Sequence, residues 1–210
     1  MATSSGHDDL TGLLDRSGFT GAFAGLGETT AVAVATVDMD GFKGVNDRHG
    51  RAVGDELLQK HARTLSGSLP PDALVARVGG DEFVVALPHT SAEGALILLE
   101  EVRAYLSAHV AVPALGRPVP ITVGVAARPP HGQSLDELLR AADAAMYRAK
   151  SEGRNRVALY VDEKMVMKSN YYERGSLAKL AKLSENLGRT EASLLREALD
   201  SLITTHARDL

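Results

Sequence analysis

The sequence has no cysteine and no tryptophan, and aromatic residues make up only 4% of the chain. Without cysteine, the protein has no disulfide, no thiolate metal site and no cysteine nucleophile, as is typical of a reducing compartment. No apolar run approaches the ~18 residues that cross a membrane, and the N-terminus lacks a basic region followed by an apolar one. A net charge of −4 gives no overall positive field for nucleic acids or membranes. We therefore expect a soluble, cytoplasmic protein that makes no contact with a membrane.

The composition of the sequence changes at about residue 161. The 210 residues, 44% of them hydrophobic, suffice for one ordinary domain and a small addition. Before residue 161, strand-like and helical segments mix and glycine and proline are frequent, whereas no proline follows it. Because both hairpins and crossovers connect the strands, residues 8–161 are predicted to form an α/β (α+β) domain with one mixed central sheet. Residues 162–210 are predicted to form a separate small segment.

The spacing of apolar residues predicts the individual elements. Strands are expected at 30–37, 74–78, 83–87, 121–126 and 157–161, and helices at 54–69, 91–108 and 134–152. The segment from 38 to 53 is predicted to be a polar loop. In the last 50 residues, leucines three or four positions apart predict two short amphipathic helices, separated by Gly188 and Thr190. Two such helices bury too little surface to be stable alone, so they need a partner.

Two acidic clusters interrupt or end predicted strands. The first, Gly79-Gly80-Asp81-Glu82, lies between two strands, and the second, Asp38-Met39-Asp40, follows another. Adjacent carboxylates repel each other unless a cation or proton lies between them, and paired glycines let a ligand approach the backbone. A hairpin with solvated acids is the simpler alternative. If the clusters meet, Asp38, Asp81 and Glu82 become hard oxygen ligands for Mg²⁺ or Mn²⁺, which commonly binds substrate phosphate as well.

Further residues suit a nucleotide phosphate. Gly41 and Gly44 leave backbone N–H groups accessible to an anion after the first strand. Lys150 and Arg154 lie four positions apart at the end of a predicted helix. These cations either neutralise phosphate charge or complement the helix dipole alone.

Asn46 and Asp55 carry hydrogen-bonding groups that could read the edge of a base. An aspartate accepts two N–H bonds from guanine, which adenine does not offer in the same arrangement. By spacing alone, these two residues would equally serve as turn and cap residues.

Five segments occur in the order of known motifs. They are DDLTGLLDR at 8–16, DMDGFKGVND at 38–47, GRAVGD at 50–55, GGDEF at 79–83 and ADAAMYRAKSEGRN at 142–155. Together they resemble the motifs of GGDEF-family diguanylate cyclases over residues 8–161. Two positions depart from the pattern, because Asp15 replaces the usual asparagine and Arg51 the usual histidine.

The resemblance implies a palm-like fold and the condensation of two GTP molecules into cyclic di-GMP with release of pyrophosphate. It implies that Asp38 and Asp81 bind the metal through side chains and Met39 through its carbonyl, and that Asp81 and Glu82 are candidates for helping to deprotonate the 3′-hydroxyl. The remaining implied roles are phosphate binding by the backbone N–H groups of Phe42 and Lys43 and by the side chains of Lys150 and Arg154, and guanine binding by Asn46 and Asp55.

One regulatory motif of the family is missing. Feedback-inhibited members carry an RxxD product site shortly before the GGDEF signature, which here is residues 79–83. This chain has Pro70-Pro71-Asp72-Ala73 at that place. We therefore expect that cyclic di-GMP does not inhibit noncompetitively.

The tail raises the question of dimerisation. The resemblance implies that two protomers, each holding one GTP, must face each other. Residues 168–202 resemble the two helices of a ribbon-helix-helix repressor, a fold that exists as an intertwined dimer. A homodimer through this tail is therefore expected, and DNA binding through a strand at 165–172 is a further hypothesis. Residues 161–210 carry eight Lys and Arg against eight Asp and Glu, so the segment has no excess positive charge to favour DNA.

Two alternatives remain open at this point. The tail could be a helical hairpin packed on its own domain. The whole chain could be a transcription regulator whose first domain senses GTP or cyclic di-GMP without significant turnover.

Overall fold

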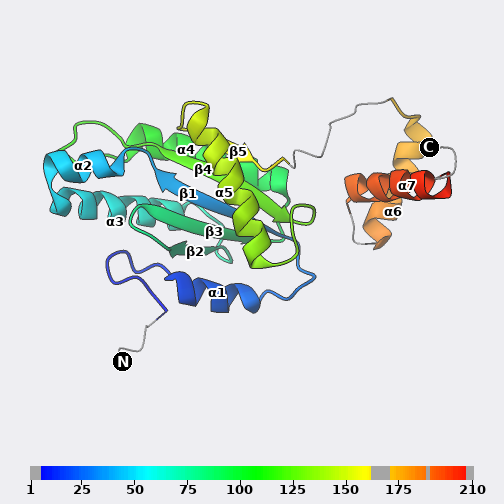
Figure 1. Cartoon of the computed structure of the whole chain (residues 1–210), viewed down its shortest axis with the longest axis horizontal. Coiled ribbons are helices and arrows are strands. Elements are labelled where there is room, and N and C mark those ends of the chain that lie inside the picture. Colours follow the sequence, from blue (N-terminus) through cyan, green and yellow to red (C-terminus); the bar gives the residue numbers. More distant parts are fainter. Residues whose placement is uncertain (1–5, 162–170, 188–189, 207–210) are drawn as a thin grey trace. The chain divides into compact units, whose positions relative to one another are not determined.

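A computed structural model describes residues 6–161, 171–187 and 190–206. The chain forms two compact units, Met1–Asp162 and Glu163–Leu210, which we call the sheet unit and the tail unit (Figure 1). None of the described helices is long and apolar enough to cross a membrane.

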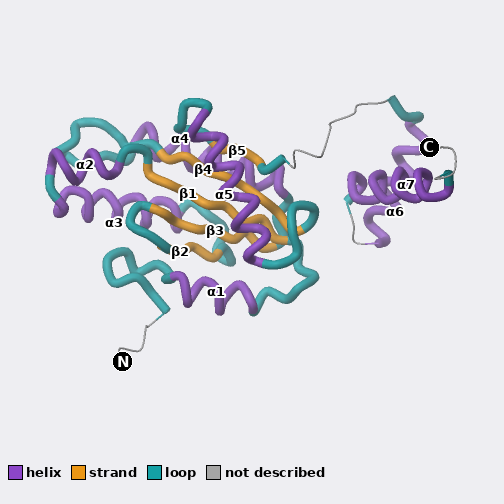
Figure 2. Tube along the Cα trace, viewed as in Figure 1, coloured by secondary structure: helices purple, strands orange, loops and turns teal. Residues whose placement is uncertain are grey.

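The sheet unit is built on a five-stranded mixed sheet (Figure 2). Its strands are β1 (Val32–Met39), β2 (Leu74–Arg77), β3 (Glu82–Pro88), β4 (Ile121–Arg128) and β5 (Val157–Leu159), in the order β2-β3-β1-β4-β5. All neighbours pair antiparallel except β4 and β5, which are parallel. The predicted mixed sheet is confirmed, as are all five predicted strand positions.

Helices cover both faces of this sheet (Figures 1 and 2). They are α1 (Arg16–Ala24), α2 (Phe42–His49), α3 (Arg51–Gly67), α4 (Ala92–His109) and α5 (Leu135–Ser151). One face packs on α2, α3 and α4, and the other on α1 and α5. Because β1 is buried on both faces, its apolar residues run continuously, with Ala33 and Ala35 in one core and Val32 and Val34 in the other.

The polar loop predicted at 38–53 is wrong, because this segment contains α2 and the first turn of α3. Its glycines and polar residues are poor helix formers, but Phe42 and Val45 are buried in the core and so stabilise α2. Positive φ angles at Gly41 (77°) and Gly50 (83°), which glycine adopts readily, set the start of α2 and the bend into α3.

Close packing fixes α5 on the sheet. A Cβ atom at Gly124 of β4 would lie 2.0 Å from the carbonyl oxygen of Ala142 and 2.4 Å from the backbone nitrogen of Met146. A capping box of Ser134 and Glu137 starts this helix. The close approach directs the C-terminal end of α5 toward the end of β1.

The tail unit contains α6 (Arg174–Leu187) and α7 (Glu191–Thr205), which contact each other. Both carry exposed leucines, including Leu183 (47% exposed) and Leu199 (56% exposed). Of the strand predicted at 165–172, residues 165–170 lie outside the described part of the chain, and Tyr171 and Tyr172 belong to no helix or strand.

Candidate metal and nucleotide site

The two acidic clusters meet at one edge of the sheet. Antiparallel pairing of β1 with β3 places Asp38 opposite Glu82. The backbone N–H of Met39 donates to the carbonyl oxygen of Asp81 at 3.2 Å. The structure therefore brings together the carboxylates of β1 and of the turn between β2 and β3, which are separated by more than 40 positions along the chain.

A lysine compensates part of this negative charge. Lys150 Nζ, from the last turn of α5, forms an ion pair with Asp38 Oδ2 at 2.8 Å. Burial and the nearby negative charge of Asp38 raise the pKa of Asp81. The side chain of Glu82 is exposed. The edge therefore holds more carboxylate charge than one lysine neutralises, which favours a bound cation.

The two glycines of the turn, Gly79 and Gly80, differ in the space around them. Neither Gly79 nor Gly80 has the left-handed backbone of a type I′ hairpin. A Cβ atom at Gly79 would lie 2.7 Å from Glu82 Oε2, so a larger residue would displace this carboxylate. At Gly80, a Cβ atom would meet nothing within 4 Å in the described part of the chain. The turn is thus open on the side of Gly80.

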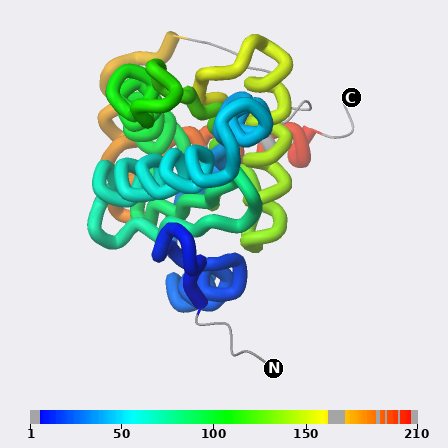
Figure 3. Tube along the Cα trace, turned by 90° about the vertical axis from the view of Figure 1, so that its left-hand side faces the viewer, coloured from blue at the N-terminus to red at the C-terminus, as the bar shows by residue number. Residues whose placement is uncertain are grey.

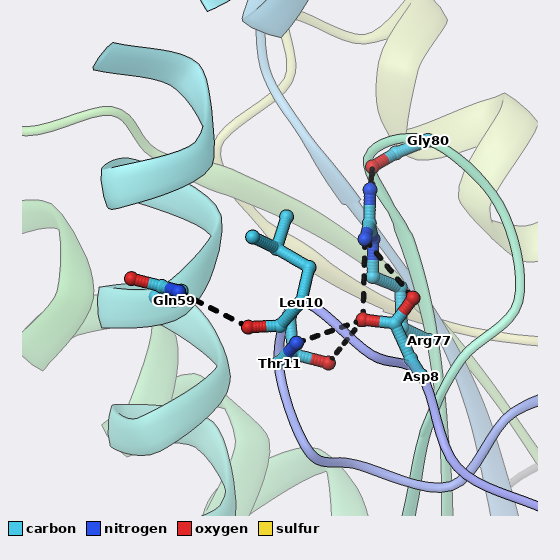
Figure 4. Close-up of polar contacts among 6 residues, drawn as sticks. All are labelled: Asp8, Leu10, Thr11, Gln59, Arg77 and Gly80. Carbon is cyan, nitrogen blue, oxygen red and sulfur yellow. Dashed lines mark hydrogen bonds and ion pairs between the residues drawn. The ribbon is translucent and has the colours of Figure 1, made fainter. Parts of the chain in front are cut away.

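Arg77 holds this turn in place (Figure 4). Its Nε and Nη2 atoms donate to the carbonyl oxygen of Gly80 at 3.1 and 2.8 Å, and Nη1 pairs with Asp8 Oδ1 at 3.1 Å. Asp8 also accepts from the backbone N–H and the hydroxyl of Thr11, at 2.9 and 2.7 Å. Burial would raise the pKa of Asp8, but the hydrogen bonds from Thr11 and Arg77 outweigh it and lower that pKa. Arg77 is not among the site residues predicted from the sequence, and its one local signal is its position just before the GGDEF motif at 79–83.

The start of α2 offers unpaired backbone donors. Gly41 is the N-cap of this helix and provides no side-chain acceptor. The N–H groups of Phe42 and Lys43, at the first helical positions, therefore have no intrahelical acceptor. The Phe42 side chain is buried and Lys43 is exposed. An anion at this helix end would meet free N–H groups and the positive end of the helix dipole.

Asn46 and Asp55 lie on successive helices next to a required glycine. The Oδ1 atom of Asn46 is buried and has no hydrogen-bond partner in the described structure. A Cβ atom at Gly54 of α3 would lie 1.9 Å from this oxygen, so the glycine makes room for the amide. Asp55, the next residue on α3, is exposed. An unpaired buried amide oxygen beside an exposed carboxylate suits a ligand with several N–H donors.

Arg154 follows the end of α5. Its backbone is left-handed (φ 60°), and within the described residues its guanidinium makes no hydrogen bond or ion pair. Lys150 and Arg154 thus differ in this structure, because Lys150 is paired with Asp38 and the Arg154 side chain remains available to a ligand.

The donor set fits a small divalent cation. Among the described residues, no three His, Cys, Asp or Glu side chains gather to hold a metal. The candidate ligands are instead the side chains of Asp38 and Asp81 and the carbonyl of Met39. Mg²⁺ typically takes one or two carboxylates and fills its other positions with water and phosphate, so this set suits a metal that shares its ligands with a substrate.

Comparison with known proteins places the chain in a family. The family described as "Diguanylate cyclase, GGDEF domain" matches residues 5–156. The chain is 40% identical to diguanylate cyclase DgcM of Escherichia coli K12 over 156 residues, covering 72% of this chain and 37% of DgcM. It is 37% identical to response regulator PleD of Caulobacter vibrioides over 158 residues, covering 71% of this chain and 35% of PleD. The chain thus spans about a third of the length of these curated relatives.

A solved structure matches as well. The GGDEF domain of DgcB from Caulobacter crescentus, in complex with c-di-GMP, superposes with a TM-score of 0.67 at 31% identity, covering 76% of this chain and 98% of that domain. The fold is the palm-like fold predicted from the sequence. The chain belongs to the family of GGDEF diguanylate cyclase domains.

Proposed function

We propose that the sheet unit is a diguanylate cyclase, which condenses two GTP molecules into cyclic di-GMP and releases two pyrophosphates. The meeting of Asp38, Asp81 and Lys150 at one sheet edge carries this proposal, because it joins candidate metal ligands to a phosphate-binding cation. Membership of the GGDEF family supports it.

Diguanylate cyclases of this family generally use a divalent metal. In our proposal, Asp38, Asp81 and the carbonyl of Met39 would hold Mg²⁺ or Mn²⁺. When bound, the metal would neutralise phosphate charge and polarise the attacked phosphorus centre. Lys150, close to the same edge, would neutralise further phosphate charge together with Arg154.

The remaining residues would position the nucleotide. The N–H groups of Phe42 and Lys43 would donate to the terminal phosphates. The Oδ1 atom of Asn46 would accept from a guanine N–H, and Asp55 would accept from two others. Selectivity for guanine would follow, because adenine would leave the buried amide oxygen unpaired.

Bond formation needs two copies of the site. The 3′-hydroxyl of one GTP would attack the α-phosphorus of the other, forming a phosphodiester bond as the bond to pyrophosphate breaks. The hydroxyl proton would leave with help from Asp81 or Glu82. GGDEF domains typically work as dimers, since each protomer holds one of the two nucleotides.

We propose that the tail unit forms that dimer in the manner of a ribbon-helix-helix protein. Exposed apolar side chains on both helices support this proposal: Leu177, Leu183, Leu187, Leu195, Leu199, Leu202 and Ile203 are each at least 38% exposed. A second copy would bury this surface. DNA binding by the same segment remains a weaker proposal, because its charges balance.

The test is to incubate the purified chain with GTP and Mg²⁺ and to measure pyrophosphate and cyclic dinucleotide. We expect both products in a ratio of two to one. A chain that gives neither product but shifts DNA would support the alternative, a transcription regulator that senses GTP or cyclic di-GMP.

A further inference from the structure

Asp40 has contacts that differ from those of Asp38, two positions earlier. Thr122 Oγ1 of β4 lies 2.8 and 2.9 Å from the two carboxylate oxygens of Asp40 and shares its hydroxyl hydrogen with them. The backbone N–H of Asn155 donates to Asp40 Oδ2 at 3.0 Å and is equally close to the Thr122 hydroxyl. Asp40 therefore connects the end of β1 with β4 and with the turn that follows α5.

That turn has an unfavourable backbone. Gly153, Arg154 and Asn155 have φ angles of 117°, 60° and 48°, so three consecutive residues are left-handed. Non-glycine residues adopt this conformation rarely, and it persists where the surroundings hold it. Besides its bond to Asp40, Asn155 is held by its side chain, because Oδ1 accepts from Arg103 Nη1 at 2.6 Å and from Ser107 Oγ at 2.9 Å.

Arg154 lies between the fixed ends of this turn. Its backbone N–H donates to the carbonyl oxygen of Ala149 at 3.0 Å. Its side chain makes no hydrogen bond or ion pair within the described part of the chain, so the backbone turn alone sets the direction in which this side chain leaves the chain. Burial raises the pKa of Asp40, and the hydrogen bonds from Thr122 and Asn155, together with the positive charge of Arg154, offset part of that rise.

We infer that Asp40 is a positioning residue that holds the 153–155 turn, and thereby directs Arg154 toward the substrate phosphates, and that it is not a metal ligand. The hydroxyl of Thr122 and the N–H of Asn155 already donate to its two oxygens and hold the carboxylate against β4 and the 153–155 turn, whereas Asp38 is paired with Lys150. The inference rests on the proposed function in one respect, because it assumes that Arg154 binds a nucleotide phosphate.

The first experiment needs no substrate. Amide hydrogen exchange is measured by mass spectrometry on the ligand-free full chain, for the wild type, Asp40→Asn and the control Asp72→Asn. Asp72 is exposed in the turn between α3 and β2, and its side chain forms no hydrogen bond or ion pair with the other described residues. We expect faster exchange of a peptide covering 150–158 in Asp40→Asn alone. Unchanged exchange in that variant would overturn the inference.

The second experiment measures the equilibrium affinity for a non-hydrolysable GTP analogue. Asp40→Asn and Arg154→Ala are each expected to weaken binding about tenfold, since each loses one charged contact to phosphate. The double variant should bind no more weakly than Arg154→Ala, because Asp40 acts through Arg154. The Mg²⁺ concentration for half-maximal analogue binding should not change in Asp40→Asn. Additive losses, or a raised Mg²⁺ requirement, would overturn the inference.

The outcomes separate the inference from the proposed function. A wild-type chain that binds the analogue but forms no cyclic dinucleotide would refute the proposed activity. The inference would still be tested in that case by comparing the affinity of the double variant with that of Arg154→Ala. A wild-type chain that does not bind the analogue would refute both.

Discussion

The sheet unit and the tail unit contain helices with similar apolar stripes but bury them to different extents. Leu138 of α5 is fully buried against the sheet, whereas Leu199 of α7 is 56% exposed. In the described residues of α6, no side chain is buried. An apolar stripe therefore predicts a helix but does not provide its partner: α5 has a sheet within the same unit, and the tail helices need a partner from elsewhere. In the sheet unit, α5 (yellow-green) lies on the opposite side from α4 (green) (Figure 3).

The largest effect is expected on turnover, from a variant that tests whether the catalytic residues lie in the sheet unit alone. Asp81→Ala should lower cyclic di-GMP formation at least a hundredfold, because losing a metal ligand removes several kcal/mol of stabilisation of the developing charge. Turnover is measured by chromatography of the products. Sedimentation should show the same oligomeric state as the wild type. Retained turnover would refute the metal assignment, and loss of the oligomer would show that the two units are coupled.

A smaller effect is expected when the tail unit is removed. A chain ending at residue 161 should keep the unfolding temperature of the sheet unit but lose its dimer, since the apolar surface of α6 and α7 is gone. Turnover should then fall most at low protein concentration, by about tenfold or more, because two protomers must meet by diffusion. Activity is measured over a dilution series.

A point variant provides the matched control for that deletion. Leu199→Glu leaves the chain length unchanged and places a charge on the exposed apolar stripe. It should weaken the dimer and lower turnover at low concentration as the deletion does. A fully dimeric, active truncated chain would refute the proposed role of the tail.

The smallest effect concerns the stability of the sheet unit and its dependence on pH. His61 is 2% exposed, and its ring nitrogens lie 3.0 and 2.9 Å from the carbonyl oxygens of Leu57 and Val119. Burial lowers the pKa of His61 below its usual 6.5, despite these hydrogen bonds. The unfolded chain therefore binds more protons, so the free energy of unfolding should fall as the pH drops below about 6.5.

Urea unfolding at pH 7.5 and 5.5 measures this dependence. His61→Gln should reduce the difference between the two pH values, and the truncated chain should keep it, because His61 lies in the sheet unit. If the free energy of unfolding of His61→Gln differs between the two pH values as much as that of the wild type, the pH dependence does not come from His61.

Much of the sheet unit could be predicted from local pattern. Its strands are apolar runs bounded by turns, and the capping box marks the start of α5. The sequence did not predict α2, because its polar residues and glycines have low helix propensity, and burial of Phe42 and Val45 overrides that preference. The Arg77–Asp8 contact was equally hidden, since 69 positions separate the two residues and neither carries a local signal of the other.

The sequence by itself determined which residue types the site contains and in what order the motifs follow one another. It therefore determined the family and the chemistry that the residues can support. Which groups two similar carboxylates contact follows only from the tertiary structure. Asp38 forms an ion pair with Lys150, whereas Asp40 accepts hydrogen bonds from Thr122 and Asn155. The physical reason is that these contacts depend on the pairing of β1 with β4 and on the packing of α5 against Gly124, which join parts of the chain that no local pattern connects.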